Sequence, residues 1–322
     1  MRALVTGAAT PLGRAVIDAL VRDPDVERVV ASAGANDPPP PPPVIFEPAA
    51  LGHARDVHDL VWRATSRHHV DTVIHLGAPC DPSTDRRASA ADVLATRRLV
   101  HHCAEHPTIR RFVYRSFAEV YALEHAASDL LDEDAALDFD PAAPAWLRDR
   151  VEADLAVLGH AGDGLSIAVL RLAEVLAADS GSQLWDYLSS RVCVRPLGFD
   201  PMLNVLSLDD AAAALVLAAR SSATGVLNIP GADTLPLSRA ITEAGRVQLA
   251  LPGPVLGPLY GARRWATGFR FRYDLNLRRF HFGGLLDGGR ARQRLGYVPR
   301  QPVRWPRAWW RVLIDRLATR AA

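Results

Sequence analysis

Through the first half of the chain, short apolar runs alternate with segments whose apolar residues recur at helical spacing. Residues 2–5 form the first run, and Leu12, Val16 and Leu20 then recur on one helical face. The other runs predict strands at 26–31, 44–46, 71–76 and 112–114, with helices at 55–67 and 92–102. This alternation is typical of an α/β protein with a doubly wound parallel sheet and helices on both faces.

The first strand runs into a glycine-spaced turn. Gly7 and Gly13 lie six residues apart, and Thr10 stands between them. A turn of this kind directs the unpaired N–H groups of the following helix at whatever lies above the strand, usually a pyrophosphate. Thr10 followed by Pro11 is also good helix-start chemistry without any ligand. The motif therefore predicts nucleotide binding, with a plain strand-to-helix turn as the alternative.

The end of the second predicted strand carries no cofactor signal. Dinucleotide-binding folds place there an acid for the ribose of NAD, or an arginine nearby for the 2′-phosphate of NADP. Here Ser32, Ala33 and Gly34 follow instead, so the choice between NAD and NADP stays open. Six prolines at 38–43 come next and predict a stiff surface excursion.

The amino-acid composition excludes several kinds of function. The 322 residues carry a net charge of +1, and every one of the 37 basic residues is an arginine, which excludes chemistry that needs a lysine. Near-neutral charge without a recognisable motif argues against nucleic-acid binding. The three cysteines are scattered without metal-ligand spacing, and the chain enters its first strand without a signal peptide. We therefore expect a soluble cytoplasmic protein with no metal site.

Several segments, in order along the chain, carry a resemblance. They are VTGAATPLGRAV, DTVIHLGAP, DVLATRRLV, RFVYRSFAEVYA, LNVLSLDDAAAA, GVLNIPG and DGGRARQRLGYVPR. Together they resemble the extended short-chain dehydrogenase/reductases, the NAD-dependent epimerase/dehydratase family. The resemblance implies a Rossmann-like NAD(P)-binding domain at 1–165. It also implies that 166–322 returns to the sheet and forms a smaller substrate domain.

The same resemblance implies where the cofactor and a second subunit bind. NAD or NADP is expected to dock on the first turn and on the end of the fourth strand, and family members often form homodimers. The implied cofactor contacts are Gly7, Thr10, Pro11, Leu12, Gly13, Leu76, Gly77, Ala78 and Arg150.

The family's catalytic residues are a serine or threonine after the fifth strand, then a tyrosine four residues before a lysine. In this chain these positions align with Phe117, Trp146 and Arg150. An indole N–H is only a hydrogen-bond donor, and arginine does not substitute for lysine as a tuner of a tyrosine pKa. The resemblance therefore predicts a catalytically degenerate member, a pseudoenzyme.

Two alternatives remain. Glu119, Tyr121 and Arg150 are candidate substitute catalytic residues for an active oxidoreductase or epimerase acting on a sugar-nucleotide or lipid-like substrate. The second alternative is that the protein has lost cofactor binding in addition to catalysis, and then it acts only by binding other proteins.

Basic charge gathers near the C-terminus, between Arg263 and Arg320. Three interpretations compete: a substrate-domain helix with a solvated face, recognition of an anionic substrate, and peripheral membrane contact. The third rests on Trp305, Trp309 and Trp310 among arginines, which are typical of an interfacial helix.

Overall fold

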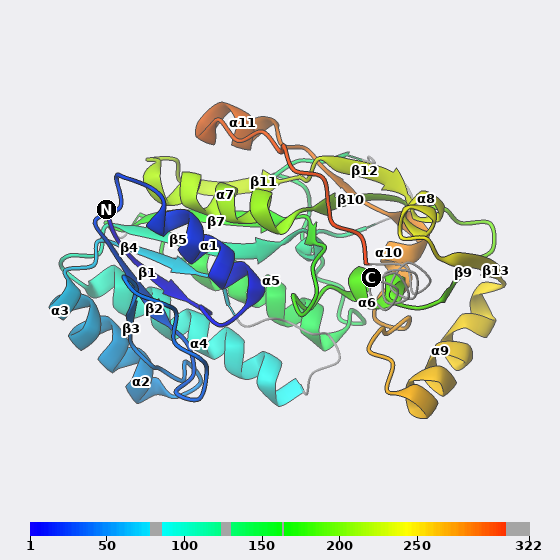
Figure 1. Cartoon of the computed structure of the whole chain (residues 1–322), viewed down its shortest axis with the longest axis horizontal. Helices are drawn as coiled ribbons and strands as arrows, with labels where there is room; N and C mark the ends of the chain where they lie inside the picture. The colour runs from blue at the N-terminus through cyan, green and yellow to red at the C-terminus, as the bar shows by residue number, and fades with distance from the viewer. Residues whose placement is uncertain (78–85, 124–129, 163, 307–322) are drawn as a thin grey trace, which may run out of the picture.

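The computed structural model describes residues 1–77, 86–123, 130–162 and 164–306 (Figure 1). Within them, seven parallel strands form the main sheet in the order β11-β7-β5-β4-β1-β2-β3. Its strands are β1 (Arg2–Thr6), β2 (Arg28–Ser32), β3 (Ile45–Phe46), β4 (Thr72–His75), β5 (Arg111–Phe117), β7 (Ser166–Leu172) and β11 (Gly225–Ile229). The predicted doubly wound parallel sheet is confirmed.

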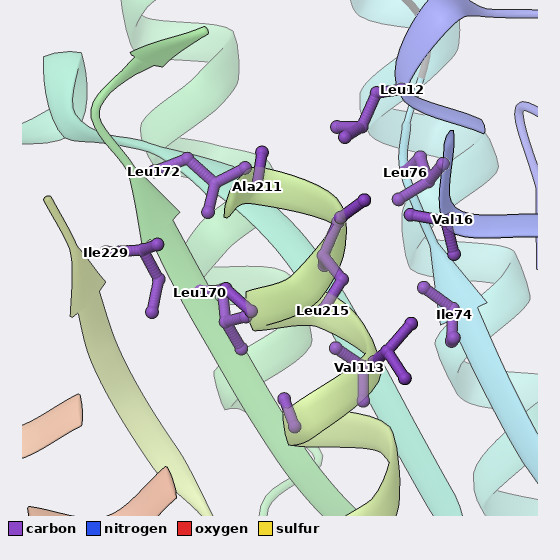
Figure 2. Close-up of a cluster of buried hydrophobic side chains, with 14 of the residues drawn as sticks. Leu12, Val16, Ile74, Leu76, Val113, Leu170, Leu172, Ala211, Leu215 and Ile229 are labelled. Atoms are coloured by element: carbon purple, nitrogen blue, oxygen red, sulfur yellow. The ribbon is translucent and has the colours of Figure 1, made fainter. Parts of the chain in front are cut away.

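Alternation along the strands supplies both faces of this sheet. In β1, Ala3 and Val5 join one buried cluster and Leu4 joins the other, because successive side chains point to opposite faces. Helices α1 (Pro11–Val21) and α7 (Leu208–Arg220) cover the first face, where their apolar residues meet those of the strands (Figure 2).

The opposite face is covered by the helices that precede and follow β4 and β5. They are α2 (Ala54–Asp59), the π-helical turn η1 (Leu60–Ala64), α3 (Thr65–His68), α4 (Arg86–Glu105) and α5 (Ala145–Leu158). The single helix predicted at 55–67 is thus three consecutive pieces, and the helix predicted from 92 begins at Arg86. Strand positions were predicted to within a few residues.

The remaining elements pack around a third buried cluster beside the carboxyl ends of the strands. This smaller part contains α6 (Gln183–Leu188), β9 (Val192–Pro196), β10 (Met202–Leu206), β12 (Asp233–Pro236), α8 (Leu237–Glu243), β13 (Val247–Leu251), α9 (Gly253–Thr267) and α10 (Leu277–Phe282). Short segments complete the description: η2 (Ala118–Val120), β6 (Leu130–Leu131), β8 (Glu174–Val175), β14 (Leu285–Leu286) and α11 (Gly289–Leu295).

The C-terminal half contributes to both parts. β7 and β11 return to the main sheet, whereas the elements between and after them build the smaller part. Of the helices in the described residues, none is long and apolar enough to cross a membrane. The predicted interfacial segment lies largely outside these residues, which end at 306 and include Trp305 but not Trp309 or Trp310.

Candidate functional site

The glycine turn at the end of β1 has a backbone that side chains would not permit. Gly7 adopts φ 74°, and a Cβ there would lie 3.0 Å from the carbonyl oxygen of Gly77. A Cβ on Gly13 would lie only 2.3 Å from the carbonyl oxygen of Gly7. Both glycines are therefore required for helix α1 to start this close to β1 and β4.

Thr10 closes the same turn with its own side chain. Its Oγ1 accepts a hydrogen bond from the Gly13 N–H at 3.0 Å and donates one to the Gly7 carbonyl at 2.8 Å. Pro11 occupies the first turn of α1, where a missing N–H costs nothing. The residue that interrupts the glycine pattern therefore stabilises the turn instead of distorting it.

A cleft of about 530 Å³ lies above this turn. Among the predicted cofactor contacts, Gly7, Thr10, Pro11 and Gly77 line its wall. Gly13 and Leu12 are buried below it, and Leu12 packs into the core. Leu76 is also buried. Arg150 lines a neighbouring cavity instead, and Ala78 lies outside the described residues.

The end of β2 contributes groups to the cleft that the sequence analysis did not assign. Asp37 lines the cleft, and its carboxylate accepts a hydrogen bond from the Gly34 N–H at 2.8 Å. Ser32 is 1% exposed, and its Oγ has no hydrogen-bond partner among the described residues. Asp37 was missed because it follows the strand by several residues, beyond the usual position of the ribose-binding acid.

Two further titratable groups line this cleft. His75, at the end of β4, is held between the hydroxyls of Thr6 (2.7 Å) and Thr96 (2.9 Å). Burial, with the nearby Arg115, lowers its pKa to about 3, so the imidazole is neutral. Asp92 on α4 has its pKa raised to about 6 by burial and by the charge of Asp149. Asp92 is a site residue that sequence reasoning missed.

The three residues predicted at the family's catalytic positions meet in one stack. The Arg150 guanidinium lies 3.7 Å from the ring centroid of Phe117 and 4.6 Å from that of Trp146. A second guanidinium, that of Arg115, lies 3.9 Å from the ring centroid of Phe117. These are cation–π distances, so the three side chains pack against one another.

Glu119 joins this stack to the smaller part of the protein. Its carboxylate lies 3.2 Å from Nη1 of Arg150 and 3.9 Å from Nη1 of Arg279 on α10. Burial alone would raise the pKa of Glu119, but these guanidinium groups hold it below its ordinary value. Arg279 also forms an ion pair with Glu174. Cavities of about 40 Å³ and 50 Å³ share this ion cluster as a wall.

Two hydroxyls near this corner, those of Ser116 and Tyr121, are committed to other partners. Ser116 donates to the carboxylate of Asp154, which is fully buried and paired with Arg171 at 2.6 Å. Tyr121 is 1% exposed and donates to Oδ1 of Asn228 at 2.7 Å. Burial raises its pKa, and the opposing effect of Arg171 does not cancel the rise. The structure thus brings Glu119 and Arg150 together but places Tyr121 in the core.

No group of histidine, cysteine and acidic side chains in the described ranges is arranged to hold a metal ion. The site consists of the cleft of about 530 Å³ on one side and the arginine–aromatic corner on the other. They adjoin at the 179–181 segment: Asp179 lines the cleft, and Ser180 and Gly181 line the smaller cavity.

Comparison with known proteins gives relatives that match most of the chain. The chain is 28% identical over 305 residues to an uncharacterized protein of Mycobacterium tuberculosis, covering 92% of this chain and 80% of that one. It is also 28% identical over 321 residues to a 3-diazoavenalumate denitrifying reductase of a Streptomyces species, covering 94% and 97%.

Solved structures share the fold. MoeE5, in complex with UDP-glucuronic acid and NAD, superposes with a TM-score of 0.70 at 20% identity, covering 94% of this chain and 95% of that one. The UDP-glucuronic acid 4-epimerase of Bacillus cereus, in complex with NAD, gives 0.68 at 16% identity, covering 94% and 92%. The model of the NAD dependent epimerase/dehydratase family matches residues 3–229, from β1 to the end of β11. The chain belongs to the NAD dependent epimerase/dehydratase family.

Proposed function

We propose that this protein binds NAD(P) in the cleft above Gly7 and has lost the proton-transfer chemistry of its family. The observation that carries the proposal is the position of Arg150, whose guanidinium lies over the rings of both Phe117 and Trp146. The family resemblance aligns these three side chains with the catalytic serine or threonine, the tyrosine that transfers the proton, and the lysine that lowers its pKa.

The backbone of the glycine turn gives the cleft a shape that suits a dinucleotide. Its turn requires glycine at two positions, as in phosphate-binding turns, and the N-terminus of α1 opens onto it. Its volume of about 530 Å³ lies within the usual range of small-molecule sites. Gly7, Thr10 and Pro11 would hold the pyrophosphate, and the bound nicotinamide would supply or accept hydride.

The part of the cleft that would hold the adenosine half of the cofactor contains groups suited to NAD and to NADP. Arg14 lines the cleft, and its guanidinium has no hydrogen bond or ion pair among the described residues, which suits the 2′-phosphate of NADP. Asp37 lines the same cleft and suits the ribose hydroxyls of NAD. Two charge changes separate them: we expect Arg14→Glu, which reverses a charge, to weaken NADP binding selectively, and Asp37→Asn, which removes one, to weaken NAD binding selectively.

The arginine–aromatic corner offers no usable proton donor near neutral pH. Phe117 has no hydroxyl, the Trp146 indole does not titrate, and an arginine keeps its proton. Glu119 is held ionised by Arg150 and Arg279, so it is not an acid at pH 7. Its carboxylate could accept a proton only by giving up its ion pairs.

Titration calorimetry with NAD⁺, NADH, NADP⁺ and NADPH tests the binding half of the proposal. We expect micromolar binding of at least one nucleotide, lost in Gly7→Val because a side chain there meets the Gly77 carbonyl. Gly257 has open space around it and lies outside the cleft, so Gly257→Val is the matched control. No binding of any of the four nucleotides would refute the proposal.

A turnover assay tests the chemical half. We expect no epimerisation of UDP-glucose or UDP-glucuronic acid in the presence of saturating NAD⁺. Turnover that disappears in Arg150→Met or Glu119→Gln would overturn the loss of proton chemistry and identify these residues as working substitutes.

A second function, reduction by hydride transfer, is favoured by the Streptomyces relative, whose name describes a denitrifying reductase. Replacement of a diazonium group by hydride forms a C–H bond and releases N₂, and it needs no proton from a side chain. An active enzyme would then tolerate Phe117, Trp146 and Arg150. Oxidation of NADPH on addition of an arenediazonium salt, with N₂ release and no activity in Gly7→Val, would support this function.

A further inference from the structure

Helix α9 is apolar yet mostly exposed. Of its 15 residues, Leu256 and Tyr260 are the buried ones. Trp265 is 91% exposed, Val255 is 48% exposed and Leu259 is 37% exposed. In Figure 1 the helix lies at the edge of the molecule, in the part away from the main sheet. Its composition is that of a covered helix, because a helix with few polar side chains normally has a partner for its apolar face.

The exposed residues form one stripe. Val255, Pro258, Leu259, Ala262, Trp265 and Ala266 follow one another at intervals of three or one, which places them along a single helical face. All six are exposed. We call this set the α9 stripe. The buried pair, Leu256 and Tyr260, points the other way and holds the helix on the protein.

The charge beside the α9 stripe is positive. No acidic residue occurs between Gly245 and Tyr273, a segment that contains five arginines. Arg270 and Arg272 are compensated by Asp179 and Asp274. Arg263 and Arg264, at the Trp265 end of the helix, have no carboxylate partner within 4 Å among the described residues. The surface that would cover the stripe therefore carries negative charge.

The length of α9 and the size of the α9 stripe indicate which kind of surface could cover the stripe. A helix of 15 residues is about 22 Å long, shorter than the roughly 30 Å hydrocarbon core of a bilayer. It can lie in the interface but cannot span it. A second protein copy is less suited to the α9 stripe, because a stable interface involves about 20–30 residues on each side and the stripe offers six, mostly small ones.

We propose that α9 docks this protein on an anionic lipid surface, with the α9 stripe in the boundary between headgroups and acyl chains. Trp265 is the interfacial anchor, and the exposed Arg264 contacts lipid phosphates, whereas the Arg263 guanidinium donates to the Val192 carbonyl and lies over the Phe269 ring. This surface is separate from the nucleotide cleft, so docking leaves the cleft residues in place. The proposal does not depend on NAD(P) binding or on catalysis.

Vesicle co-sedimentation of the full chain tests the proposal. The lipids are phosphatidylcholine alone and phosphatidylcholine mixed with phosphatidylglycerol. We expect sedimentation with the mixed vesicles only, and release by high salt. Trp265→Ser should weaken partition at least tenfold, and Arg264→Glu about fivefold or more, because each removes an interfacial contact.

Two matched controls sit on other surfaces. Phe139→Ser removes an aromatic side chain that is 67% exposed, and Arg22→Glu reverses an exposed charge at the end of α1. Both variants should sediment like the wild type. Thermal unfolding of Trp265→Ser and Arg264→Glu should match the wild type, because neither side chain is buried.

Three results would overturn the proposal. The first is no sedimentation with the mixed vesicles, and the second is equal sedimentation of wild type and both α9 variants. The third is a lipid-independent dimer, seen by analytical ultracentrifugation and abolished by Trp265→Ser, which would assign the α9 stripe to a second copy of the chain.

Discussion

The glycine turn lines the cleft, the arginine–aromatic corner lines the neighbouring cavity, and the two regions are built differently. In the turn, Thr10 stands where the family resemblance predicts a glycine, and its hydroxyl bonds to Gly13 and Gly7 keep the backbone closed. In the corner, the three residues predicted at the catalytic positions contact one another, with Arg150 over Phe117 and Trp146. We therefore expect a site built from backbone to tolerate a side-chain change that a site built from titrating groups does not.

The largest expected effect comes from breaking the turn. Gly13→Ala places a Cβ 2.3 Å from the Gly7 carbonyl, so helix α1 must move away from β1. Nucleotide affinity measured by calorimetry should fall at least 100-fold, or about 3 kcal/mol. Gly257→Ala, where nothing lies within 4 Å, should bind nucleotide like the wild type. Equal binding by both variants would mean that the nucleotide does not use this turn.

Breaking the corner should affect stability instead of binding. Arg150→Met removes the nearer cation from Glu119 and from two aromatic rings, and we expect a loss of about 3 kcal/mol in the free energy of unfolding. Urea denaturation measures this loss. Nucleotide affinity should change by less than about threefold, or 0.7 kcal/mol. A larger loss of affinity would place Arg150 in contact with the cofactor, as the family resemblance predicts.

The same variant has a pH signature. The pKa of Glu119 is lowered in the folded protein, so its ion pair stabilises the fold above the unfolded pKa of about 4.3 and is lost as pH falls through the lower folded value. The stability difference between wild type and Arg150→Met should therefore shrink below pH 4. A constant difference across pH would assign the effect to the aromatic contacts alone.

Tyr121→Phe tests a residue that lies outside both the glycine turn and the arginine–aromatic corner. The change leaves Oδ1 of buried Asn228 without its donor, which costs about 2 kcal/mol of stability. Nucleotide binding and any measured turnover should be unchanged. Loss of turnover without loss of stability would make Tyr121 a catalytic residue after all.

The smallest expected effect is a gain in stability. The pKa of Asp92 is raised to about 6 in the folded protein, compared with about 3.9 when unfolded, so wild-type stability falls as pH rises through this interval. Asp92→Asn removes that loss. After allowance for partial solvent exposure, the variant should be more stable than the wild type by about 1 kcal/mol at pH 7. Below pH 4 the two proteins should be equally stable. Thermal unfolding between pH 4 and pH 8 would measure this.

The sequence predicted the parts that depend on neighbours along the chain. β1, the turn and α1 follow from local apolar spacing and from capping by Thr10, and all three were placed correctly. The placement of Phe117, Trp146 and Arg150 at the catalytic positions came from the family resemblance and stays a prediction. Their mutual stacking was not predicted, because it depends on how β5 meets α5.

Contacts between distant segments account for what was missed. Arg279 reaches Glu119 and Glu174 from α10, and no local pattern links these residues. Asp37 enters the cleft because the chain turns back after Gly34, and the 55–67 helix is interrupted by a π-helical turn that apolar spacing does not reveal.

The strand order of the main sheet has a consequence for synthesis. β7 lies between β5 and β11, so the outer edge of β5 has no neighbour until residues 166–172 have left the ribosome. A chain cut after residue 165 would present that edge, flanked by apolar side chains, to other nascent chains. Such unpaired edges are templates for aggregation. A nucleotide-binding fragment of this protein should therefore extend at least to Ile229, so that β7 and its neighbour β11 are both present.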